Sequence, residues 1–295
     1  MHELPDHAKG MLITVAGVLA VTPDSLLIRL VSADFMTLMF WRGLLVCLTL
    51  AAGLFAVHKG QILAKFAAIG WPGLVFAGLF SLNSFSFVLA VETTTVANTL
   101  VLISAAPLFA AIIARLFLQE TVRRRTWLAI LAATAGIVVI VSGSLGGGGA
   151  LLGDLAALVT ALGLAIQFNI LRRYRAVNMI PAIAVGNLIT ALVSLPFADT
   201  LAIVPMDVLW LCLLGVAVMP VAAALIVTGP RYLPAPEVSL VLLLETVVGP
   251  FWVWLALGEV PSGRAFLGGA IVIAALAGHA TAALRRRPDP VEFRA

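Results

Sequence analysis

The chain has 295 residues, of which 62% are hydrophobic and 11% are charged. Soluble domains carry about 25% charged residues, so this composition excludes a soluble protein and predicts an integral membrane protein. The net charge of +4 does not indicate a nucleic-acid partner, because the eighteen lysines and arginines lie in short clusters between apolar runs, as membrane topology requires. Cys47 and Cys212 lie inside apolar segments and match no disulfide or zinc spacing. We therefore expect no metal and no cofactor.

Windows of about twenty predominantly apolar residues, enough to cross a bilayer, recur along the whole chain. The first continues from Lys9 to Arg29 without a small-residue cleavage site, so we expect a retained helix and no signal peptide. The sequence predicts ten transmembrane helices, at residues 10–29, 35–57, 67–90, 94–117, 126–144, 150–171, 179–198, 208–229, 236–257 and 263–284.

The positive charges alternate with these helices. Fourteen lysines and arginines fall on one side of the membrane: Lys9, Lys59, Lys65, Arg123, Arg124, Arg125, Arg172, Arg173, Arg175, Arg231, Arg285, Arg286, Arg287 and Arg294. Only Arg29 and Arg264 fall on the other side, and Arg42 and Arg115 lie within helices. Because cytoplasmic loops collect positive charge, both termini are predicted to be cytoplasmic, in a multi-pass protein of the cell (inner) membrane.

A glycine run, Gly146–Gly149, divides the chain into two sets of five helices. Because five is odd, the second set enters the membrane from the opposite face, an inverted arrangement common among transporters. We expect a first repeat at 1–145, a flexible linker at 146–149, a second repeat at 150–284 and a basic cytoplasmic tail at 285–295.

The ninth predicted helix carries an acid, Glu245, near its middle, followed by Thr246 and Pro250. A carboxylate at membrane depth is costly unless it is paired, protonated or faces a wet cavity. We expect Glu245 to contact a cationic group or a proton; the alternative is a bond to a neighbouring helix.

Asp24 in the first helix and Arg42 in the second should lie at similar depth, roughly 8–11 Å from the same membrane surface. An ion pair between them is predicted, either bracing the outer mouth or contacting substrate. Pro23 should bend the first helix beside Asp24, and Trp41 beside Arg42 is a further candidate for the cavity wall.

Neutral polar residues lie in several predicted helices, and Asn83, Asn98 and Asn187 are the candidate substrate contacts among them. Such residues also act as hydrogen-bonded links between helices, and this alternative stays open. Gln167 and Asn169 could form a matching inner mouth or an interface. Glu120 and Glu259 end their helices and are interpreted as structural loop anchors.

The chain resembles the drug/metabolite transporter superfamily, in its ten-helix EamA-type branch. The resemblance lies in Phe40-Trp41-Arg42-Gly43, Ala106-Pro107 to Gln119-Glu120, Leu244-Glu245-Thr246 to Gly258-Glu259, and Gly268-Gly269. It implies an all-α membrane protein with two inverted five-helix repeats around a central cavity, usually exporting a small metabolite. It also assigns the small-residue-rich fifth and tenth helices to packing or to a homodimer. One departure is Thr246, where the family often has proline.

The function predicted on these grounds is secondary-active export of a small, amino-acid-like metabolite by alternating access. The partners are a small-molecule substrate and the lipid bilayer, with protons as candidate coupling ions. A lipid or lipid-linked sugar flippase of the same fold is the alternative. An intramembrane enzyme is disfavoured, because no nucleophile–base pattern or His-Glu-x-x-His motif occurs.

Overall fold

The computed structural model describes residues 6–58, 61–117, 124–144, 150–174, 177–228 and 235–284, and every regular element in these ranges is a helix. The predicted all-α membrane fold is confirmed. The glycine linker and the basic tail lie outside the described residues. In chain order the helices are α1 (Asp6–Val21), α2 (Asp24–Leu30), α3 (Phe35–His58), α4 (Ile62–Ala67), α5 (Gly70–Thr93), α6 (Val96–Ile103), α7 (Ala106–Phe117), α8 (Arg124–Ser144), α9 (Ala150–Arg173), α10 (Ile180–Ser194), a 3-10 turn (Leu195–Phe197), α11 (Pro205–Cys212), a π-helix (Leu213–Val218), α12 (Met219–Thr228), α13 (Ala235–Leu257) and α14 (Gly263–Leu284).

These helices make the ten predicted spans, because three spans are each built from more than one helix. The first span consists of α1 and α2, the fourth of α6 and α7, and the eighth of α11, the π-helix and α12. Among the described residues, six spans are long and apolar enough to cross a bilayer by length and composition, and shorter apolar helices lie in the other four.

Several predicted boundaries differ from those of the structure by three or four residues. The third span begins at Gly70 instead of residue 67, because the short helix α4 precedes it. The turn between them needs a left-handed residue, which Gly70 supplies with φ of 56°. The eighth span begins at Pro205 instead of residue 208, with proline in the first helical turn, where its missing N–H is not needed.

Prolines account for the irregular backbone of the first and eighth spans. Pro23 has no N–H to donate to the Leu19 carbonyl, and the Thr22 Oγ1 hydroxyl donates to that carbonyl instead, at 2.9 Å. The predicted bend at Pro23 is confirmed as a break between α1 and α2. Pro220 likewise leaves the Val216 carbonyl without its helical donor, and Val216 lies within the π-helix.

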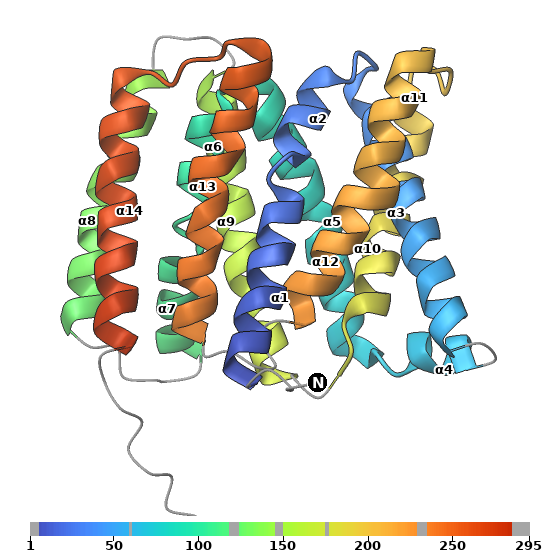
Figure 1. The fold of residues 1–295 in the computed structure, drawn as a ribbon, viewed down its shortest axis with the longest axis horizontal. Coiled ribbons are helices and arrows are strands. Elements are labelled where there is room, and N and C mark those ends of the chain that lie inside the picture. The colour runs from blue at the N-terminus through green and yellow to red at the C-terminus, as the bar shows by residue number, and fades with distance from the viewer. Residues whose placement is uncertain are drawn as a thin grey trace, which may run out of the picture.

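The two sets of five spans pack in symmetry-related pairs (Figure 1). The second and seventh spans (α3 and α10) meet, as do the fifth and tenth (α8 and α14). The third span packs on the sixth (α5 on α9). The equivalent contact is the eighth span on the first (α12 on α1). Exchanging the two sets therefore preserves the pattern of neighbours, as inverted repeats require.

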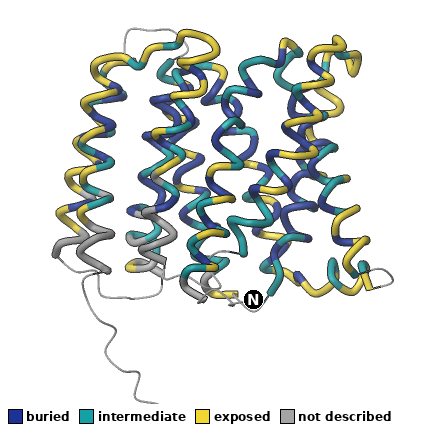
Figure 2. Tube along the Cα trace, in the orientation of Figure 1, coloured by how far each residue is buried: buried dark blue, intermediate teal, exposed yellow. Residues whose placement is uncertain are grey.

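The start of α1 and the end of α14 lie at the same end of the bundle (Figure 1), which we call the terminal end. At the opposite end, which we call the far end, α2 finishes and α11 begins. Buried residues face the middle of the bundle and exposed ones its outside (Figure 2). Large apolar side chains such as Leu63 and Phe266 are exposed there, which suits a surface that contacts lipid.

Helices α8 and α14 approach closely through glycines. A Cβ on Gly136 would lie 2.7 Å from the Gly268 carbonyl oxygen and 2.7 Å from a methyl group of Val272. Small residues at such crossings allow close backbone approach in membranes. The small residues predicted for packing are therefore used within the chain.

We expect Gly136→Ala to lower the thermal unfolding midpoint in detergent, since an added methyl in a filled contact costs about 1–3 kcal/mol. The matched control is Gly78→Ala, because a Cβ there meets nothing within 4 Å. Alanine in an open helical position should stabilise by up to about 1 kcal/mol. Equal midpoint shifts for the two variants would contradict the close packing of α8 on α14.

Candidate functional site

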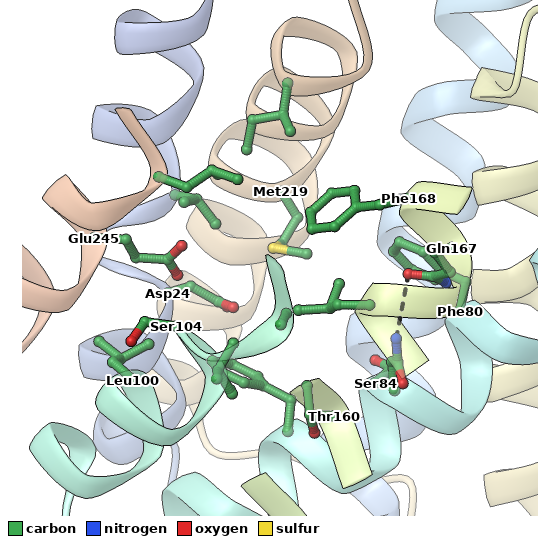
Figure 3. Close-up of a pocket in the computed structure, with 18 of the residues that line it drawn as sticks. Asp24, Phe80, Ser84, Leu100, Ser104, Thr160, Gln167, Phe168, Met219 and Glu245 are labelled. Atoms are coloured by element: carbon green, nitrogen blue, oxygen red, sulfur yellow. Dashed lines mark hydrogen bonds between the residues drawn. The ribbon is translucent and has the colours of Figure 1, made fainter. Parts of the chain in front are cut away.

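A cavity of about 240 Å³ lies between the two repeats. In the described residues its walls come from α1 and α2, α3, α5, α6 and α7 on one side of the repeat division, and from α9, α12 and α13 on the other (Figure 3). Helices α8, α10 and α14 contribute no described lining residue. The cavity thus lies where the inverted halves meet, the position of substrate sites in transporters of this architecture.

An ion pair forms part of the wall. The Arg42 Nη2 donates to Asp24 Oδ2 at 3.1 Å and to Asp24 Oδ1 at 3.4 Å, and both side chains are 4% exposed. Arg42 Nη1 donates to Ser84 Oγ at 2.6 Å, and Nη2 also reaches the Met219 sulfur at 3.5 Å. The predicted pairing of Asp24 with Arg42 is confirmed, and the guanidinium is engaged by three neighbouring elements.

Asp24 lies beside the break in the first span. It is the first residue of α2, directly after Pro23, so its side chain leaves the span where the chain changes course. Trp252 of α13 braces this break, because its Nε1 donates to Thr22 Oγ1 at 3.1 Å. The ion pair and the ninth span are therefore connected through the same irregular segment.

Glu245 of α13 lines the same cavity. Figure 3 shows its carboxyl group beside Asp24, and the two acids are close enough to interact electrostatically. No described residue donates a hydrogen bond to Glu245 or pairs with it. Helix α13 continues through Pro250 to Leu257, although proline cannot donate a hydrogen bond to the helical ladder.

An amide pair lies on another part of the wall. Asn83 Nδ2 of α5 donates to Gln167 Oε1 of α9 at 3.2 Å, and both side chains are buried. Gly163 lies against the Asn83 amide, and a Cβ at that position would overlap the Asn83 Oδ1. The pair therefore links the two repeats at a point where α9 needs a glycine.

Aromatic and aliphatic side chains complete the walls, and sequence reasoning missed them. Phe80 and Phe87 of α5 line the cavity together with Asn83 and Ser84. These positions are i, i+3, i+4 and i+7, so they share one helix face. Thr160, Leu164, Gln167 and Phe168 form the corresponding face of α9. The spacing around each predicted amide could have identified these residues.

Three predicted contacts do not line the cavity. Trp41 Nε1 donates to the Leu201 carbonyl at 3.2 Å in the far-end turn. Asn98 Nδ2 donates to Asp154 Oδ1 at 3.3 Å, and Asn187 Nδ2 donates to the Ile183 carbonyl of its own helix at 2.9 Å. Of the seven predicted site residues, the cavity gathers four: Asp24, Arg42, Asn83 and Glu245. Asn169 also lies outside the lining and donates to the Ala165 and Ala110 carbonyls.

A buried apolar cluster separates the cavity from the far end. One member, Leu100, also lines the cavity. The members on α2 and α5 follow Asp24 and Phe87, and those on α3 precede Arg42, so they lie farther toward the far end than the lining residue of their helix. The core members are Leu27, Ile28, Val31, Leu38, Met39, Val88, Val91, Val96, Leu100, Leu211, Leu214, Val218 and Val253. Solute cannot pass this packed layer without a change in helix positions.

Polar contacts hold the far end closed above this cluster. Arg29 Nη2 lies 3.3 Å from Glu259 Oε2 and donates to the Thr94 carbonyl at 2.6 Å. Glu259 Oε1 accepts from the Val96 N–H at 2.8 Å, at the start of α6. The interpretation of Glu259 as a loop anchor is confirmed, and Glu120 lies outside the described residues. Sequence reasoning missed Asp154, which accepts a hydrogen bond from Thr94 Oγ1 at 2.8 Å.

Among the described residues, no group of three or more His, Cys, Asp or Glu side chains is arranged to hold a metal ion. The ionisable groups of the described cavity wall are Asp24, Arg42 and Glu245. Chemically, this arrangement can bind a positively charged group and accept hydrogen bonds within an otherwise apolar chamber.

We expect Arg42→Met to lower stability by about 3–5 kcal/mol, because it leaves Asp24 with no cation inside the protein. Asp24→Asn should lower stability less than Arg42→Met, because the Glu245 carboxyl in the same cavity can still compensate the charge of Arg42. The double variant should recover part of the loss. Thermal unfolding in detergent measures all three, and strictly additive effects of the two substitutions would contradict their coupling.

Comparisons with known proteins agree with this architecture. The model of the EamA-like transporter family matches twice, at residues 8–142 and 151–280. The uncharacterized transporter YdfC of Bacillus subtilis (strain 168) is 26% identical over 213 residues, covering 68% of this chain and 69% of YdfC. A solved crystal structure shares the fold with a TM-score of 0.67 at 19% identity, over 95% of this chain and 100% of that one. The two family matches cover most of the chain and fall on either side of the glycine linker, so this protein belongs to the EamA-like transporter family.

Proposed function

We propose that the protein is a secondary-active exporter of a small, amino-acid-like metabolite, and that the substrate amine binds at Glu245. The observation that carries the proposal is the Glu245 carboxyl, which lines the cavity between the repeats without a described partner. An unpaired acid at membrane depth marks a substrate or ion pathway by default.

The cavity size supports a small substrate. Ligand pockets for drug-sized molecules occupy about 300–1,000 Å³, and this cavity measures about 240 Å³. That volume suits a metabolite with an amine and a short apolar body better than a lipid-linked sugar. The flippase alternative therefore has less support than transport of a small metabolite.

The electrostatics favour an amine over an anion. The two terminal nitrogens of Arg42 already contact Asp24, Ser84 and Met219, and only its buried Nε has no described partner, so an anionic substrate could engage this guanidinium with both of its oxygens only by displacing one of these contacts. Glu245 and Asp24 together offer two carboxylates to an ammonium group without displacing any bond of Glu245. A substrate amine would neutralise the excess negative charge of the cavity, which low-dielectric surroundings make costly.

Transport would proceed by alternating access between the two five-helix repeats. The apolar cluster and the Arg29–Glu259 contact close the far end, and opening would require the repeats to rock about the cavity. The positive-charge distribution supports placing the terminal end in the cytoplasm of a cell (inner) membrane. Export is the direction that the family resemblance favours, and this chain would act without enzymatic chemistry.

Proton exchange would supply the energy. Glu245 can hold either a proton or an amine, so release of one permits binding of the other. Arg42 faces Asp24, and the Asp24 carboxylate faces Glu245, so the cluster contains one carboxylate beyond its single cation. Substrate entering from the cytoplasm would then leave as a proton returns.

We expect Glu245→Gln to reduce protein-dependent uptake of labelled leucinamide into acid-interior vesicles by about tenfold or more, because a hydrogen bond to a charged group contributes about 1.5–3 kcal/mol. Protein-free vesicles give the blank for passive amine entry. The control is Asp199→Asn, which also replaces a carboxylate by an amide, at an exposed site in the far-end turn. Uptake by Glu245→Gln equal to wild type would remove Glu245 from the mechanism.

The orientation has its own test. In a variant without Cys47 and Cys212, a membrane-impermeant maleimide should label Ala202→Cys in intact cells, because Ala202 is exposed in the far-end turn. Gln61→Cys, exposed at the start of α4, should be labelled only after permeabilisation. The reverse pattern would place the terminal end outside the cell.

A further inference from the structure

We infer that the substrate carries one positive charge, on its amine, and also has a carboxamide-type group. Asn83 and Gln167 bind this second group. The inference rests on the proposed function, because it assigns the amine to Glu245. It adds a second binding position, on α5 and α9, and selects among amino-acid-like molecules.

The charge of the cavity favours a cation over a zwitterion. When both acids are ionised, Asp24 and Glu245 supply two negative charges, and Arg42 supplies one positive charge. A ligand with a net charge of +1 leaves this chamber neutral, whereas a free amino acid leaves the excess negative charge in place. The carboxylate of an amino acid would also have to compete with Asp24 for Arg42, which is buried and hydrogen-bonded to Ser84.

The amide pair has unmet hydrogen-bonding capacity. Asn83 Oδ1 and Gln167 Nε2 have no hydrogen-bond partner among the described residues. Both residues are buried, with exposed fractions of 6% and 4%. Reversing both amides does not remove this deficit, since it leaves an Asn83 N–H group and the Gln167 oxygen unpaired. In either orientation the pair lacks one donor and one acceptor.

Buried polar groups without partners are uncommon and point to a missing ligand or water. A carboxamide supplies both missing groups, because its carbonyl accepts from one amide and its N–H donates to the other. A simple amine supplies nothing here, and a carboxylate supplies only acceptors. The unpaired Asn83 Oδ1 lies against Gly163 of α9, so ligand binding would require the Asn83 side chain to rotate toward the cavity.

The two binding positions lie on different sides of the cavity. Figure 3 shows Glu245 and Asp24 on one side and the hydrogen-bonded amide pair on another. Phe80, Phe168 and Leu164 also line the chamber and provide apolar surface for an uncharged side chain. A ligand with an amine, an aliphatic branch and a carboxamide therefore meets a complementary group at each position.

A matched ligand series tests the inference. Leucinamide, 3-methylbutylamine and leucine share one aliphatic branch but present, respectively, an amine with a carboxamide, an amine alone, and an amine with a carboxylate. Binding to the purified full chain in detergent is measured by calorimetry at a pH at which both amines are protonated. We expect leucinamide to bind about tenfold more tightly than 3-methylbutylamine, since it gains hydrogen bonds to buried groups. Leucine should bind more weakly than either.

Variants separate the two binding positions. Gln167→Leu should remove the advantage of leucinamide over 3-methylbutylamine while leaving the affinity for 3-methylbutylamine within about twofold. Asn169→Leu, an amide removed from the same helix outside the cavity lining, should keep that advantage. Glu245→Gln should weaken both amines about tenfold or more. Thermal unfolding of each variant confirms that it is folded, and Asn83→Leu is the second variant if Gln167→Leu is not.

The outcomes distinguish the two proposals. If leucinamide has no advantage in the wild type, or keeps it in the folded amide-pair variant, the carboxamide inference is wrong while amine binding at Glu245 stands. If neither amine binds, or if Glu245→Gln binds both as the wild type does, the proposed function itself is wrong.

Discussion

The ion pair between Asp24 and Arg42 is the constraint on which the rest of the cavity depends. Two charges cannot remain at this depth in a bilayer without each other or water. Their pairing joins the broken first span to the second, and the Ser84 and Met219 contacts extend it to the third and eighth. The wall between the repeats is thereby held together, and Glu245 is left without a partner among the described residues.

The backbone breaks serve the same site. In a membrane, carbonyl groups freed by proline must find another donor or face protein or a cavity. Pro23 places Asp24 at the start of α2, and the Thr22 hydroxyl satisfies the Leu19 carbonyl. The π-helix before Pro220 precedes Met219, which contacts the Arg42 guanidinium. Two of the cavity-lining side chains, Asp24 and Met219, therefore lie next to irregular segments, whereas Asn83, Gln167 and Glu245 come from the regular helices α5, α9 and α13.

The two ends of the bundle differ in how they are closed. The far end combines the apolar cluster with the contacts of Arg29, Glu259, Thr94 and Asp154, so apolar burial and polar pairing act at the same place. Rocking of the repeats in alternating access would have to separate these contacts together. Such coupling would make the far end open as one unit, as gating by rigid bodies needs.

The sequence by itself determined the all-helical membrane fold, the ten spans, the break at Pro23 and the Asp24–Arg42 pair. Apolar length, charge placement and helical depth are local properties that any folded form must respect. The sequence also contained the faces of α5 and α9, because Phe80, Asn83, Ser84 and Phe87 follow helical spacing. Only the tertiary structure decided which of the neutral polar residues line the cavity. Asn98 and Asn187 look equivalent to Asn83 in the sequence, but Asn98 bonds Asp154 and Asn187 bonds its own helix, since the rotation of each span about its axis is set by packing against neighbours from the other repeat.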